Sequence, residues 1–155
     1  MNGTSPRLLK VIPLIIVLLT TLACPAFSED IQMLIKRAKG GNPDDQCSLG
    51  NLYNQGKGVP QDYAEAAKWY SKAAEQGHSS AQSMLGYHYA LGHGVPRDYL
   101  LAYFWFSLSA SRSKDDFEYG MTAGSRDEAA KKLTPEQLMK AQQMTRDWEA
   151  KHPRK

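Results

Sequence analysis

Residues 49–77, LGNLYNQGKGVPQDYAEAAKWYSKAAEQG, decide the fold, because the pattern recurs 36 residues further on. Residues 85–113 read LGYHYALGHGVPRDYLLAYFWFSLSASRS, and the string Gly-x-Gly-Val-Pro and a tryptophan stand at the same places in both segments. Self-similarity at such a period is typical of repeat proteins, in which each unit buries its apolar face only against its neighbours. We therefore expect a stack of repeats with modified units at the ends.

Each unit is predicted to form two helices joined by a tight turn. Gly56 and Gly58 can take positive φ at little cost, so they end the first helix and reverse the chain, and Pro60 cannot continue that helix. Asp62 is a good N-cap for the second helix, and Glu65 three residues on completes the capping-box pattern.

Small and aromatic residues share the second helix of each unit. Alanines let paired helices approach closely, while the aromatic side chains fill the space between neighbouring units. Trp69 and Trp105 recur at the same phase beside such alanines, so we expect both to lie in the core between helices.

The string from Leu49 to Gly77 closely resembles the Sel1-like repeat, and residues 85–110 match it nearly as well. The resemblance implies an all-α fold, a short α/α superhelical array related to tetratricopeptide repeats, that acts as an adaptor for protein–protein contact. Some members of this family carry two cysteines per repeat and disulfide-bonded helix pairs, but this chain lacks that pattern.

The boundaries follow from the repeat period. We expect two full repeats flanked by half-repeat caps, which makes six helices in the mature chain and no strand. The repeats are placed at about 46–81 and 82–117, the N-terminal capping helix at 31–39 and the C-terminal capping helices at 117–151. The string Thr-Pro-Glu-Gln from Thr134 is a capping box with Pro at the first helical position.

Residues 1–28 are predicted to form a signal peptide. Two basic residues precede an apolar run over 11–23, and Ala-Phe-Ser at 26–28 puts small residues at the −3 and −1 positions of a cut. An uncleaved anchor is the alternative, although a mature membrane helix needs about 20 apolar residues. Cleavage would leave one repeat domain at 29–155, exported to the periplasm or secreted, with no stable membrane insertion.

A second cut is possible in front of Cys24. Leu22-Ala23-Cys24 loosely resembles a bacterial lipobox, in which the cysteine would be lipidated. The alternative function is therefore a lipidated structural component of the cell envelope. The first residue of the mature protein, Glu29 or a lipidated Cys24, separates the two hypotheses.

The net charge limits the classes of partner that we expect, and the cysteine count limits the disulfides that the chain can form. Removing the signal takes away Arg7 and Lys10 and no acid, so the net charge falls from +3 to +1. Without a clustered basic surface, we expect no nucleic-acid partner. Cys47 would then be the lone thiol, which excludes an internal disulfide and is typical of a small packing residue.

The chain shows no arrangement typical of catalysis. The two Gly-x-Gly strings stand between helices and recur with the repeat, so they are turns rather than phosphate loops. His88 and His93 have no cysteine or carboxylate at a usual ligand spacing, and we expect most histidines to lie at the surface. We predict no enzyme, no cofactor and no metal, with an envelope hydrolase as the remote alternative.

The second repeat carries an apolar stripe where the first carries charge. Leu101, Phe104 and Leu108 replace one acid and two lysines. We expect the final helix, over 135–150, to cover this stripe, the alternative being an exposed partner groove. Gly120 and Gly124 are predicted to let that helix come close.

The first helices of the two repeats should line the concave face, as the resemblance to tetratricopeptide arrays suggests. The partner is expected to be another protein or peptide. The candidate partner-binding residues on this face are Asn51, Gln55, Tyr87 and Leu91.

Overall fold

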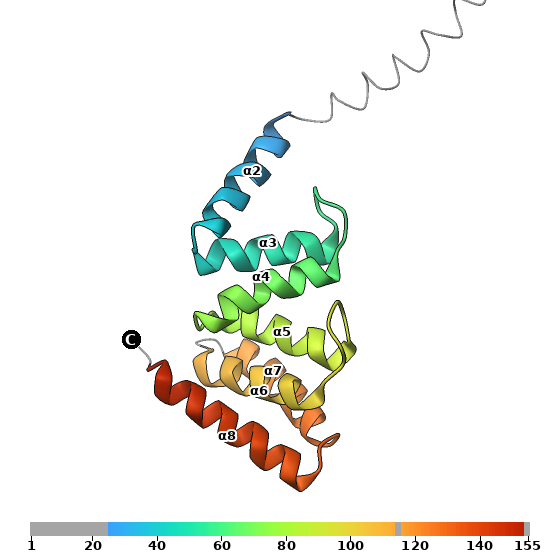
Figure 1. The fold of residues 1–155 in the computed structure, drawn as a ribbon, viewed down its shortest axis with the longest axis vertical. Coiled ribbons are helices and arrows are strands. Elements are labelled where there is room, and N and C mark those ends of the chain that lie inside the picture. Colours follow the sequence, from blue (N-terminus) through green and yellow to red (C-terminus); the bar gives the residue numbers. More distant parts are fainter. Residues whose placement is uncertain (1–24, 114–115, 154–155) are drawn as a thin grey trace, which may run out of the picture.

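The computed structural model describes residues 25–113 and 116–153 (Figure 1). These residues form seven helices and no strand: α2 (Pro25–Lys39), α3 (Pro43–Gln55), α4 (Tyr63–Glu75), α5 (Ser79–Leu91), α6 (Tyr99–Arg112), α7 (Asp116–Ala130) and α8 (Pro135–Lys151). The expected count of six was one too low, since the N-terminal cap, two helices from each repeat and the two C-terminal helices make seven. The apolar run over 11–23, on which the predicted signal peptide rests, and Cys24 lie outside the described residues.

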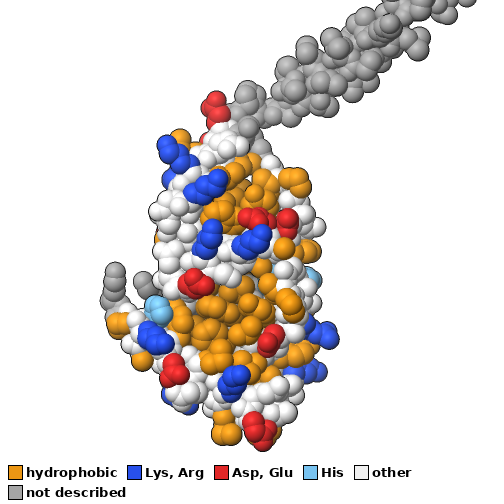
Figure 2. Space-filling model, in the orientation of Figure 1, with side chains coloured by type: hydrophobic (Ala, Val, Ile, Leu, Met, Phe, Trp, Pro, Cys, Tyr) orange, Lys and Arg blue, Asp and Glu red, His pale blue; other side chains and the backbone are white. Residues whose placement is uncertain are grey.

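From α2 to α5 the helices follow one another along the long axis in the order of the sequence, while α6 and α7 overlap below them and α8 lies at the far end (Figure 1). Each helix from α2 to α7 packs against the next, as a repeat array requires. Helix α8 departs from this order, because it packs against α6. Figure 2 shows hydrophobic side chains gathered over the middle and lower part of one face, with single charged side chains at the border.

The turns within the two repeats have the expected geometry. Gly56 and Gly58 take φ values of 66° and 73°, and their equivalents Gly92 and Gly94 take 75° and 70°. A Cβ at Gly94 would lie 2.2 Å from the backbone of Tyr63, so the second turn packs on the start of α4. Glycine is therefore required there for close approach as well as for its φ angle.

The predicted helix starts are confirmed with one difference. Asp62 accepts a hydrogen bond from the backbone N–H of Glu65 at 2.9 Å, but the Glu65 carboxylate pairs with Lys68 instead of returning to the cap. The capping box of α8 is complete, because Thr134 and Gln137 each accept a hydrogen bond from the other's backbone.

Glycines on the first helices admit aromatic rings from the second helices. A Cβ at Gly50 would lie 2.7 Å from the Tyr70 ring, and one at Gly86 would lie 2.7 Å from the Phe106 ring. Both rings are fully buried. This close approach places the core between the two helices of each repeat.

The two tryptophans differ in burial. Trp69 is buried in a cluster with Ala38 and Leu49, which confirms its predicted place. Trp105 is half-buried at the edge of the neighbouring cluster around Tyr70, so it contributes less to the core than expected.

Helix α8 docks on the second repeat as predicted. Phe104 and Leu108 are buried and Leu101 is half-buried, while Ala141 on α8 is fully buried. The glycines of α7 do not serve this docking, however. A Cβ at Gly120 or Gly124 would meet no atom within 4 Å, so the expectation that α8 approaches them is wrong.

Candidate partner-binding groove

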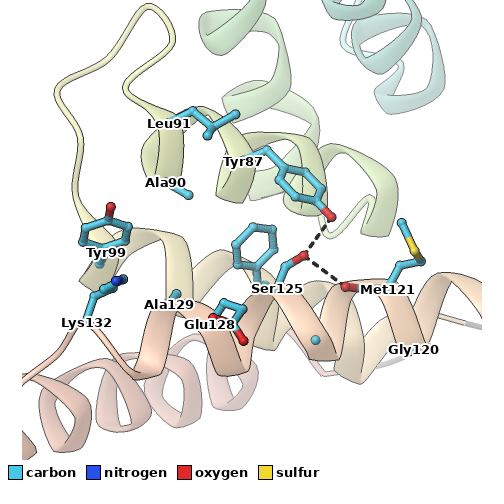
Figure 3. Close-up of a pocket in the computed structure, with 12 residues that line it drawn as sticks. Tyr87, Ala90, Leu91, Tyr99, Gly120, Met121, Ser125, Glu128, Ala129 and Lys132 are labelled. Atoms are coloured by element: carbon cyan, nitrogen blue, oxygen red, sulfur yellow. Dashed lines mark hydrogen bonds between the residues drawn. The ribbon is translucent and has the colours of Figure 1, made fainter.

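An open groove lies between α5, α6 and α7, on the side where the two glycines of α7 face outward (Figure 3). Its volume is about 530 Å³, and its walls are mainly apolar. Helix α5 contributes Tyr87, Ala90 and Leu91, and α6 contributes Tyr99 and Phe106. Helix α7 and the turn after it supply the opposite wall, between Gly120 and Lys132.

The groove combines a packed floor with an exposed rim. Phe106 and Ala129 are buried at its base, together with Ala102 beneath them. At the rim, Leu91 and Met121 are 60% and 56% exposed. Large apolar side chains left open beside a formed hollow are typical of a binding surface.

One hydrogen-bond chain crosses the groove. The hydroxyls of Tyr87 and Ser125 lie 2.8 Å apart, and the Ser125 hydroxyl also donates to the carbonyl oxygen of Met121 (Figure 3). The Tyr87 ring meets the Phe106 ring edge to face, with centroids 4.9 Å apart. The hydroxyl contact therefore joins α5 to α7, and the ring contact joins α5 to α6.

The four candidate partner-binding residues lie in two separate places in the structure. Tyr87 and Leu91 line the groove, whereas Asn51 and Gln55 stand on α3, one repeat away. Asn51 accepts a hydrogen bond from the Tyr70 hydroxyl at 2.8 Å, and Gln55 is exposed.

Comparisons with known proteins identify the repeat. The Sel1 repeat family model matches residues 43–78 and 79–114. A Sel1 repeat protein from Oxalobacter formigenes has a similar crystal structure, with a TM-score of 0.58 and 35% identity, over 63% of this chain and 72% of that chain. The chain belongs to the Sel1 repeat family.

A second solved Sel1-type structure is similar over more of this chain. It is c5321, described as a protective antigen present in uropathogenic Escherichia coli strains displaying an SLR fold, with a TM-score of 0.71 and 38% identity. The similarity covers 79% of this chain and 25% of c5321, so this chain spans a quarter of that protein's length. A search of curated proteins found no match.

Sel1 repeat proteins are generally non-catalytic scaffolds for protein–protein interaction. In the part of this chain that the structure describes, no group of three or more His, Cys, Asp or Glu side chains could hold a metal ion. The same residues contain no helix with the length and hydrophobicity needed to cross a membrane.

The corresponding space beside the first Sel1 repeat, between α3, α4 and α5, is filled by side chains of the second repeat. His88 is only 3% exposed, and its ring lies between Tyr63 and Tyr70, with centroids 6.1 Å and 5.3 Å away. Its Nδ1 lies 2.7 Å from the carbonyl oxygen of His93, and its Nε2 lies 3.2 Å from the amide oxygen of Asn54. Burial lowers the pKa of His88 below its usual range.

This buried histidine was not anticipated from the sequence, which led us to expect most histidines at the surface. His93 stacks on the Tyr63 ring at 4.6 Å, and His78 caps α5 by accepting a hydrogen bond from the N–H of Ala81. The signal available was the helical spacing of His88 from Ala81 and Leu85, which stand seven and three residues earlier on the buried face of α5.

Proposed function

We propose that this chain is an exported, non-catalytic adaptor that binds another protein through the groove between α5, α6 and α7. The observation that carries the proposal is the apolar groove itself, with Leu91 and Met121 open at its rim. The general role of Sel1 repeat proteins as interaction scaffolds supports it. Tyr87 and Leu91 are the proposed contacts in the groove.

The contact surface is proposed to continue onto the first repeat. Asn51 and Gln55 stand at the positions of α3 that Tyr87 and Leu91 occupy on α5, since each pair is separated by the repeat period of 36 residues. A bound segment that follows the row of first helices would pass from the apolar groove to these polar side chains. Polar rims around an apolar centre are usual in protein interfaces.

Export is part of the proposal. The basic start, the apolar run over 11–23 and the small residues at 26–28 support cleavage after Ser28, which would place the protein in the periplasm or outside the cell. The alternative is a structural envelope component held by a lipid on Cys24, which the string Leu22-Ala23-Cys24 supports.

Site-specific photo-crosslinking in living cells tests the binding surface. A photoreactive amino acid would be placed at Leu91 in the groove, at Gln55 on the first repeat and at Lys140 on the exposed side of α8. We expect the same partner protein to be captured from Leu91 and more weakly from Gln55, and not from Lys140. No adduct at Leu91, or equal capture at all three positions, would contradict the proposed surface.

A further inference from the structure

We propose that the partner anchors in this groove through an aromatic side chain flanked by acidic residues, in the place that corresponds to the histidine rings at the junction of the first and second repeats. This inference rests on the proposed function, because it names the chemistry of the segment that the groove would take.

The junction between the first and second repeats shows which side chains occupy this space when the chain itself fills it. The rings of His88 and His93 lie against Tyr63, which is the first residue of α4. The His93 ring is nearly parallel to Tyr63, at an angle of 17°. Two flat side chains therefore occupy the region between one second helix and the following first helix.

The second repeat keeps the aromatic side chains against which the histidine rings pack. Tyr99 begins α6 as Tyr63 begins α4, Phe106 stands at the place of Tyr70, and Ala90 replaces Asn54. All three line the groove. The polar partner of a histidine is thus lost from this position, while the aromatic face is retained.

Helix α7 and the turn after it carry no side chains that correspond to the two histidine rings. Helix α7 begins 37 residues after α5, at Asp116 instead of 36 residues on, so Ser125 takes the place of His88 and Gly124 precedes it. Either residue is too small to reach across. Helix α7 also continues to Ala130 with no Gly-x-Gly turn, so nothing corresponds to the stacked ring of His93.

Tyr99 is consequently left without a ring partner among the described residues. The group over its face is the guanidinium of Arg97, 5.7 Å from the ring centre. Figure 3 shows Tyr99 beside Lys132 at one end of the groove. An aromatic side chain from outside would restore the contact, because aromatic rings favour stacked or edge-to-face pairs at about 4.5–7 Å and bury a large apolar area.

The charges around the groove indicate which residues should flank the aromatic side chain in the partner. Lys132 and Glu128 line the mouth, but the Glu128 carboxylate is already paired with Lys131. With Glu128 and Lys131 neutralising each other, Lys132 in the lining and Arg97 over Tyr99 are the cations left beside the groove. Acidic residues next to the aromatic anchor would complement this positive rim and speed association.

Binding of short peptides to the purified protein tests the inference. The probes are the pentapeptide Asp-Glu-Trp-Glu-Asp, the same peptide with Leu at its centre, and Lys-Lys-Trp-Lys-Lys, titrated by calorimetry at low salt. We expect the acidic Trp peptide to bind about 2- to 12-fold more tightly than the Leu peptide, which is the usual worth of an aromatic pair beyond its buried area. The lysine-flanked peptide should bind most weakly, and its disadvantage should shrink as salt is added.

Two variants locate the site, and one serves as the control. Gly124→Leu would fill the groove, and a side chain has room there because no atom lies within 4 Å of a Cβ. It should abolish binding of the Trp peptide, whereas Lys140→Leu on the exposed side of α8 should leave it unchanged. Tyr99→Leu should retain weak binding but remove the preference for Trp over Leu.

The outcomes separate this inference from the proposed function. Equal affinities for the Trp and Leu peptides, both lost in Gly124→Leu, would overturn the aromatic anchor and leave the groove as the binding site. Peptide binding that survives Gly124→Leu, or no binding by any peptide, would overturn the inference. A Trp preference that Gly124→Leu removes supports it, even if crosslinking from Leu91 finds no partner protein and the adaptor function falls. Capture of a second copy of this chain from Leu91 would replace the acidic segment as the occupant.

Discussion

Individual glycines have opposite roles in the helices of this protein. At Gly86 the missing side chain admits the Phe106 ring, since a Cβ would lie 2.7 Å from its nearest atoms. At Gly124 a Cβ would meet nothing, and the missing side chain leaves the groove open. The same residue type thus allows a close contact on α5 and leaves an open surface on α7.

Alanine substitutions at these two glycines should change stability in opposite directions. Gly124→Ala should stabilise the fold by up to about 1 kcal/mol, because alanine favours a helix over glycine and no neighbour is disturbed. Gly86→Ala should destabilise it, because the Phe106 ring must move. Thermal unfolding of both variants provides the measurement. A lower Tm for Gly124→Ala would show that another element packs on it.

The burial of Trp69 sets the cost of its removal. Trp69→Ala should cost about 3–5 kcal/mol, the usual range for a buried aromatic residue, which is a large part of the ~5–15 kcal/mol that stabilises a typical domain. Trp105→Ala should cost less, because that ring is half-buried. Denaturant unfolding measures both, and an unchanged midpoint for Trp69→Ala would contradict its place in the core.

The buried His88 should make stability depend on pH. Its pKa is lowered in the folded state, so the unfolded chain takes up this proton first as the pH falls below about 6.5. The stability is therefore present above that pH and is lost progressively as the pH falls toward the folded-state value. Between about pH 7.5 and pH 5.5, His88→Gln should show a smaller drop in Tm than the unchanged protein. An identical drop in both would assign the effect to other groups.

At the scale of elements, the helices and their ends could be predicted because their signals are local. Asp62, Thr134 and the paired glycines of the turns act through neighbouring backbone atoms, and each was found where the sequence placed it. The phase of the helix that follows the second repeat was less predictable. One extra residue in α6 relative to α4 shifts α7, and no turn motif marks the change.

The groove could be predicted only in part for the same reason. Tyr87 and Leu91 were recognised because they project from a first helix in the repeat pattern. Gly120 and Gly124 were read as a close contact with α8, since a pair of small residues looks the same whether it faces a helix or an open space. Only the tertiary path of α8, which packs on α6, decides between these possibilities.

Removal of α8 should expose the apolar stripe of α6. A chain truncated after Leu133 would uncover Phe104 and Leu108, which are buried in the full structure, and would leave the end of the stack without its cap. We expect this truncation to melt at a lower temperature and to aggregate. Size-exclusion chromatography with thermal unfolding would show it, and a soluble monomer of unchanged Tm would contradict the docking of α8.

At the scale of the whole molecule, α8 ties the C-terminal end of the stack to an earlier repeat. Its Trp148 ring lies 4.7 Å from the Arg112 guanidinium, and Arg112 donates to the carbonyl oxygen of His152. Both side chains also approach Gly77, in the turn between α4 and α5. The C-terminal cap therefore spans more than one unit, whereas α2 contacts the array through α3.

The proposed export predicts how the N-terminal end of the stack is trimmed. A cut after Ser28 would shorten α2 to residues 29–39 and would keep Ile31, the first buried side chain in the described part of the chain. As it stands, α2 has no acid in its first turn, but the shortened helix would begin with Glu29 and Asp30, which complement the positive end of the helix dipole. We therefore expect the protein recovered from the envelope or medium to have the mass of residues 29–155 and a net charge of +1. Intact mass spectrometry decides this: the mass of residues 1–155 would refute cleavage, and a diacylated start at Cys24 would establish the lipid-anchored alternative with the whole of α2 retained.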